Sequence, residues 1–114
     1  MSRHTFETHH QGHPVEVTLG WDRPLQYFHL TVERVDTSPS DEDDQRYVYC
    51  NLADPDAHGQ DLDYFLMILA GLGIAIPASM IAQVRIDGEV NRGNHEVVHR
   101  GEDDFDVLHS EHVR

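Results

Sequence analysis

The chain has 114 residues, which predicts one domain, since domains most often contain about 100–150 residues. It carries 21 acidic and 8 basic residues, and the resulting net charge of −13 disfavours direct binding to nucleic acid or to an anionic membrane. A partner of this surface should therefore be basic. Protonating the ten histidines would change the charge from −13 to −3, so the surface charge is sensitive to mild acid.

The cysteine content and the N-terminal segment predict a cytoplasmic location. Cys50 is the single cysteine, which excludes a disulfide within the chain. The first residues are polar and show no signal-peptide pattern. Residues 64–84 carry no charge, but Gly71, Gly73 and Pro77 interrupt them. We interpret this stretch as two short core helices and expect no membrane contact.

The first half of the chain has the pattern of β-strands. Apolar and polar residues alternate over residues 14–19 and 25–35, as in strands that bury one face. Residues 5–10 predict a short polar strand, and residues 46–52 are rich in strand-forming residues. Four consecutive strands predict an antiparallel meander with one face covered.

The second half changes to helical spacing. Asp61 is placed to cap a first helix, and Gly73 to end it. Pro77 is placed to open a second helix. The predicted fold class is therefore α+β: a four-stranded antiparallel sheet followed by a helix hairpin packed on one face. Residues 1–100 would form this domain, and residues 101–114 an acidic, flexible tail.

One segment matches the H-E-x-x-H pattern of zinc hydrolases, at His95, Glu96 and His99. On a helix, the two histidines would bind zinc and the glutamate would act as general base. The glycine and the third histidine that often extend such a motif are replaced by Glu102 and Phe105. A zinc-dependent hydrolase or a metal-binding protein using His95 and His99 is therefore kept as an alternative. The main interpretation has no catalytic residue and no cofactor.

The acidic residues cluster, and this clustering leads to the main functional interpretation. Carboxylates on a rigid fold can imitate a nucleic-acid backbone and occupy a basic groove. We therefore expect a non-enzymatic protein that binds a basic, nucleic-acid-binding protein. The predicted acidic contacts are Asp41, Glu42, Asp43, Asp44, Asp54, Asp56, Asp61 and Asp63. If exposed, aromatic and arginine side chains would add contacts, and the candidates are Trp21, Arg23, Tyr47 and Tyr49.

Several segments resemble a family of short, uncharacterised bacterial proteins that plasmids and other mobile elements often carry. The residues behind the resemblance are 4–6, 17–25, 49–52, 62–65, 72–74 and 91–94. The resemblance brings no catalytic motif. It implies a small accessory protein, and mobile elements often carry acidic inhibitors of host defence, including anti-CRISPR and anti-restriction proteins. A third alternative is an assembly partner, including a homodimer, that uses an apolar strip of the helix hairpin.

Overall fold

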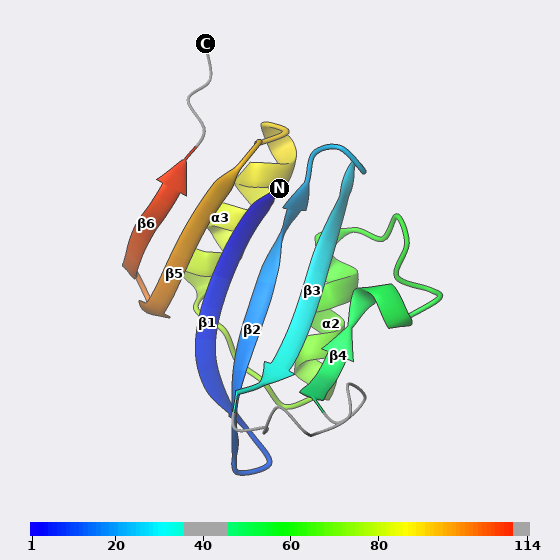
Figure 1. Cartoon of the computed structure of the whole chain (residues 1–114), viewed down its shortest axis with the longest axis vertical. Helices are drawn as coiled ribbons and strands as arrows, with labels where there is room; N and C mark the ends of the chain where they lie inside the picture. Colours follow the sequence, from blue (N-terminus) through cyan, green and yellow to red (C-terminus); the bar gives the residue numbers. More distant parts are fainter. Residues whose placement is uncertain (36–45, 111–114) are drawn as a thin grey trace.

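The computed structural model describes residues 1–35 and 46–110 as a twisted sheet with two helices on one face (Figure 1). The six strands have the order β4-β3-β2-β1-β5-β6. The helices are α2 (Leu62–Gly71) and α3 (Ala78–Glu89), and a short 3-10 turn, η1, covers Asn51–Ala53. The strands are β1 (Ser2–His10), β2 (His13–Asp22), β3 (Tyr27–Arg34), β4 (Tyr47–Cys50), β5 (His95–Gly101) and β6 (Asp104–Ser110).

The chain is α+β as expected, but the predicted four-stranded antiparallel meander is wrong. Strands β1 to β4 do pair antiparallel in chain order. β1 is nevertheless a central strand, because its other edge pairs in parallel with β5. β6 then pairs antiparallel with β5 and forms the far edge. The sheet is therefore mixed, and only β5 lies between the first and last described strands, β1 and β6 (Figure 1).

Part of the segment predicted as an acidic, flexible tail is a strand. Residues 104–110 form β6, and the turn before it contacts the start of α3. All seven residues of β6 are exposed, and its apolar alternation is limited to Phe105 and Val107, so the hydrophobic signal for a strand is weak.

The core lies between the sheet and the helices. The inward residues at the centres of β2 and β3 are fully buried, and α2 and α3 cover them with apolar side chains. Gly88 allows α3 to approach the sheet closely, because a Cβ atom there would lie 2.5 Å from the Phe28 ring. The main core residues are Val15, Val17, Leu19, Leu30, Val32, Phe65, Leu69, Met80 and Val84.

The two helices begin differently. As predicted, Asp61 caps α2, and its side chain accepts a hydrogen bond from the Tyr64 N–H at 3.1 Å. The residue before α3 is Pro77, which offers no side-chain cap. Instead, the Glu102 carboxylate from the β5–β6 turn accepts hydrogen bonds from the N–H groups of Ala78 and Ser79. Neither helix in the described ranges has the length and apolar character needed to cross a membrane.

Candidate functional site

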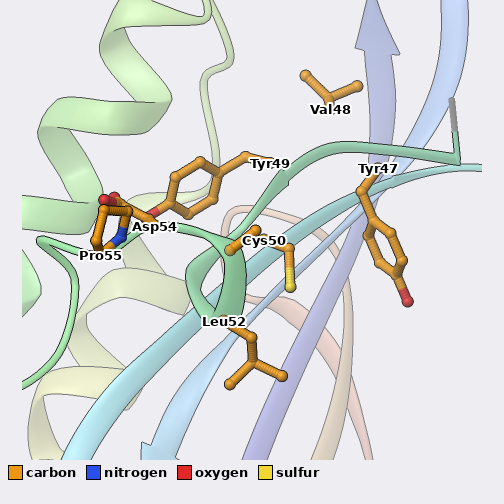
Figure 2. A pocket seen from close by; sticks show the side chains of 8 residues that line it. Tyr47, Val48, Tyr49, Cys50, Leu52, Asp54 and Pro55 are labelled. Atoms are coloured by element: carbon orange, nitrogen blue, oxygen red, sulfur yellow. The ribbon is translucent and has the colours of Figure 1, made fainter. Parts of the chain in front are cut away.

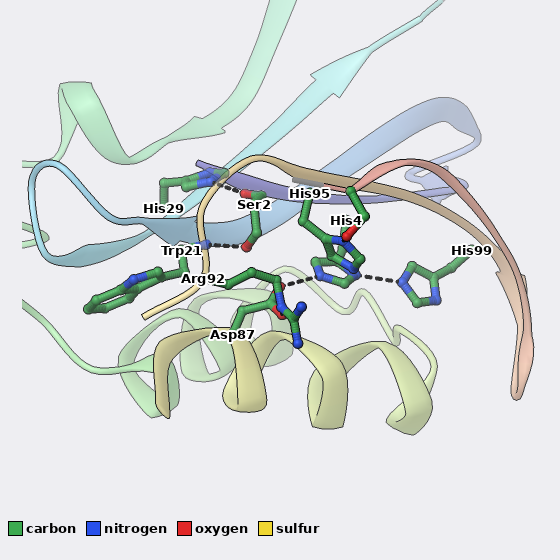
Figure 3. Close-up of polar contacts among 9 residues, drawn as sticks. Ser2, His4, Trp21, His29, Asp87, Arg92, His95 and His99 are labelled. Carbon is green, nitrogen blue, oxygen red and sulfur yellow. Dashed lines mark hydrogen bonds and ion pairs between the residues drawn. The ribbon is translucent and has the colours of Figure 1, made fainter. Parts of the chain in front are cut away.

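A cluster of polar side chains is buried between the sheet and α3 (Figure 3). His4 of β1 is opposite Val97 of β5, so His95 and His99, two residues to either side of Val97, flank His4 on the same face. The His4 ring centroid lies 5.8 Å from that of His95 and 5.1 Å from that of His99. Asp87 approaches from α3. Because His4, Asp87 and His99 are at most 2% exposed, their polar atoms need partners inside the protein.

Three of these side chains form a continuous hydrogen-bonded chain. The His4 Nε2–H donates to Asp87 Oδ2 at 2.6 Å, and His4 Nδ1 lies 2.8 Å from His99 Nε2. If His4 is neutral, His99 must donate to it through Nε2–H; if His4 is protonated, it donates to both neighbours. The positions of the atoms are compatible with either arrangement of hydrogen bonds.

Asp87 is held in its ionised form. Its Oδ1 accepts a hydrogen bond from Arg92 Nε at 2.6 Å, which makes a second charge-assisted contact. Burial raises the pKa of Asp87, but hydrogen bonds from His4 and Ser2 and the positive charge nearby outweigh it and lower the pKa overall. An ionised carboxylate is therefore available inside the protein at neutral pH.

His99 is held in its neutral form. Burial, with a smaller contribution from the neighbouring His4, lowers the pKa of His99 to about 4. Its Nδ1 atom is buried and has no hydrogen-bond partner among the described residues. A buried polar atom without a partner costs free energy, so this nitrogen is an unusual feature of the cluster.

The H-E-x-x-H segment lies on β5 and not on a helix. Successive strand residues point to opposite faces, so Glu96 lies on the open face while His95 and His99 lie on the helix side. On the open face, Glu96 is opposite Arg3 and His109. The zinc-hydrolase alternative needs both histidines and the glutamate around one ion, and the strand separates them.

The open face of the sheet carries a row of three carboxylates. Glu16 of β2 is opposite Glu7 of β1 on one side and opposite Glu33 of β3 on the other. Adjacent strands lie about 4.8 Å apart, so these like charges are close. Burial raises the pKa of Glu16, and the charges of Glu7 and Glu33 raise it further. Arg46 compensates at one end, donating from Nε to Glu33 at 2.8 Å. Like charges directly opposite each other destabilise a sheet.

Three of the predicted contact residues meet at a hollow of about 720 Å³ beside β4, namely Tyr47, Tyr49 and Asp54 (Figure 2). Tyr47 is exposed, whereas the Tyr49 hydroxyl donates to Asp54 at 2.8 Å. The Tyr64 hydroxyl donates to the same carboxylate oxygen. These two hydrogen bonds lower the pKa of Asp54. Asp54 therefore holds the segment after η1 against α2.

The other predicted contacts are dispersed. Trp21 is 9% exposed, packs against Phe28 and donates from Nε1 to Asn91, so its ring faces the core. Arg23 is exposed in the β2–β3 turn. Asp61 caps α2, and Asp63 pairs with Arg85 at 3.2 Å.

Two parts of the predicted acidic surface remain. Asp56 is exposed in the loop before α2. The acidic block Asp41–Asp44 lies outside the described residues.

The sequence interpretation did not include His4, Asp87 or the row of glutamates. One signal for Asp87 was present: it continues the helical stripe of Met80 and Val84, where an apolar residue is expected. His4 gave no comparable signal, because its partners are 83 and 95 residues away in the sequence.

Comparisons with known proteins give no further assignment: no family model, no curated protein and no solved structure matches the chain.

Proposed function

We propose that the chain is a non-enzymatic interaction protein whose open sheet face binds a basic surface of a nucleic-acid-binding protein. The observation that carries the proposal is the row Glu7–Glu16–Glu33 on three adjacent strands. The helices pack on the opposite face, so this row faces outward. Because the repulsion within this row lowers the stability of the fold, the row indicates a functional requirement.

The chemistry of the row suits a cationic partner. Arginine and lysine side chains placed between the glutamates would relieve their mutual repulsion, so binding would gain more here than at isolated surface carboxylates. The net charge of −13 adds long-range attraction that speeds association with a basic protein. A nucleic-acid groove is the common protein surface that presents such a cationic array. The resemblance to mobile-element proteins favours a host defence enzyme as the target.

The test uses two triple variants with the same change in net charge. The first is Glu7→Gln/Glu16→Gln/Glu33→Gln on the open face. The tagged protein is incubated with a bacterial lysate, and captured proteins are eluted with a salt gradient and identified. We expect a basic DNA- or RNA-binding protein that the wild type retains at low salt and the variant does not. A double-stranded oligonucleotide should release the captured protein, because the oligonucleotide would compete for the same groove.

The matched control changes three exposed acids away from the row: Asp56→Asn/Asp63→Asn/Glu89→Gln. Asp56 and Asp63 are among the contacts predicted from the sequence, and an interface at the open face leaves both outside it. It should retain the partner, with a similar salt dependence. Equal loss in both triple variants would show that only the net charge matters and would contradict an interface at the open face. Retention that salt does not weaken would contradict the electrostatic basis, since exposed charges are screened over about 8 Å at physiological ionic strength.

A further inference from the structure

The second arrangement that calls for an explanation is the buried cluster around His4, which the proposed interaction surface does not use. We propose that His4, Asp87 and His95 form a binding site for one divalent transition-metal ion of the Zn²⁺ class. Each residue offers one ligand atom, and these atoms all lie within 4.8 Å of one another. Two imidazoles and one carboxylate are a donor set that suits Zn²⁺.

Each of the three ligands is held in place through its other polar atom. His4 Nδ1 is 2.8 Å from His99 Nε2, and Asp87 Oδ1 accepts from Arg92. His95 Nδ1 lies 3.0 Å from the Ser110 hydroxyl. Such contacts fix the tautomer and orientation of metal ligands, and they are typical of protein metal sites. They leave His4 Nε2, His95 Nε2 and Asp87 Oδ2 to bind the ion (Figure 3).

The ion replaces the proton that His4 Nε2 and Asp87 Oδ2 share. In a tetrahedral site with bonds of about 2.0–2.1 Å, neighbouring ligand atoms are roughly 3.3 Å apart. The contact of 2.6 Å between His4 and Asp87 therefore opens slightly, and the His95 ring moves inward. Since His95 is half-buried, the ion can enter from its side.

His99 gives His4 Nδ1 a hydrogen-bond partner both with and without the ion. When His4 binds the ion through Nε2, it must carry its proton at Nδ1 and donate to His99 Nε2. Neutral His99 then carries its own proton at Nδ1. That atom has no hydrogen-bond partner in the described structure, so no contact opposes the change of tautomer. A purely structural hydrogen-bond network would gain nothing from leaving this nitrogen without a partner.

The test is a calorimetric titration of the metal-free protein with Zn²⁺, which measures the stoichiometry and the affinity. We expect one ion per chain. His95→Ala should weaken binding at least tenfold, because even loss of a residue that only supports a ligand costs about 10–100-fold in affinity. His95 is half-buried and supports no other part of the cluster, so this variant should fold. Asp87→Asn, which keeps the shape of the side chain, should weaken binding similarly.

Controls distinguish this site from surface histidines. His9→Ala and His109→Ala change exposed histidines outside the proposed ligand set and should alter the affinity less than twofold. Nitrogen-15 NMR of the imidazoles gives a second readout: Zn²⁺ should shift Nε2 of His4 and His95 and leave no metal-bound nitrogen in His99. Wild-type affinity in His95→Ala, or loss of binding in either control, would overturn the assignment. Binding of clearly less than one Zn²⁺ ion per chain by the wild type would also overturn the assignment.

Discussion

Replacing Glu16 by glutamine should stabilise the protein at neutral pH, although the change removes a charged group from the surface. The carboxylate of Glu16 is opposite Glu7 and Glu33, and burial together with these two charges raises its pKa. A cross-strand pair contributes roughly 0.2–1 kcal/mol, with the unfavourable sign for like charges. Glu16 makes two such pairs, and Arg46 weakens the repulsion in one of them. Glu16→Gln should therefore raise the free energy of unfolding by about 0.5–1.5 kcal/mol.

The pH dependence of this gain follows from the direction of the pKa shift. A carboxyl group with a raised pKa in the folded state destabilises the protein while it is ionised, so the penalty is full at pH 7. As the pH falls through the raised pKa, Glu16 takes up a proton and the penalty disappears. The wild type and Glu16→Gln should therefore differ in free energy of unfolding at pH 7 and converge below about pH 4.

A matched control makes the same chemical change where the carboxylate is favourable. Glu102 accepts hydrogen bonds from two N–H groups at the start of α3, where a negative charge also interacts well with the helix dipole. Glu102→Gln should destabilise the protein by about 0.5–1 kcal/mol at pH 7. The two glutamine variants should thus have opposite effects.

Urea denaturation monitored by the fluorescence of Trp21, the single tryptophan, measures both effects. In a thermal melt, 1 kcal/mol corresponds to a Tm change of roughly 4 °C for a domain of this size. The reasoning is refuted if Glu16→Gln is neutral or destabilising at pH 7. It is also refuted if the gain persists unchanged at pH 3, since the repulsion would then not be its cause.

Three further predictions concern the buried cluster and the core. In metal-free protein, the low pKa of His99 should cost up to about 3 kcal/mol of stability as the pH falls from 6.5 to 4, because the unfolded state takes up a proton that the folded state excludes. In chemical denaturation, the free energy of unfolding of His99→Gln should depend less on pH over this range. Asp87→Ala should destabilise by about 3–5 kcal/mol in urea denaturation, because the buried His4 and the partly buried Arg92 lose their acceptor; a loss below 1 kcal/mol would contradict this. Gly88→Ala should lower Tm by an amount equivalent to about 1–3 kcal/mol through its clash with Phe28, whereas Gly71→Ala, with open space around it, should not.

The sequence predicted the elements whose inward residues are apolar. Strands β2 and β3 and helix α2 have clear periods, and their positions agree with the structure. The hydrophobic pattern does not predict β5, because two of its inward positions are His95 and His99. Hydrophobic periodicity does not detect a strand whose inward residues are satisfied by hydrogen bonds.

The candidate sites depend on strand register, which the sequence did not give. His95 and His99 were singled out, but for a helical zinc motif. Their actual neighbour, His4, becomes visible once β1 and β5 are known to pair in parallel. The glutamate row likewise requires the register of two hairpins, since Glu7, Glu16 and Glu33 are unremarkable surface acids when each is considered alone.

The central position of β1 also affects how the protein can be synthesised. β1 leaves the ribosome before the other described strands and can pair with β2 as soon as β2 follows, but its other edge waits for β5, about 95 residues later. At 5–20 residues per second, that delay is roughly 5–20 s. During this time a nascent chain exposes an unpaired strand edge together with His4, which has neither of its buried partners. Stalled chains that end before β5 should therefore be cleaved by protease within residues 2–10, and the complete chain should be protected there.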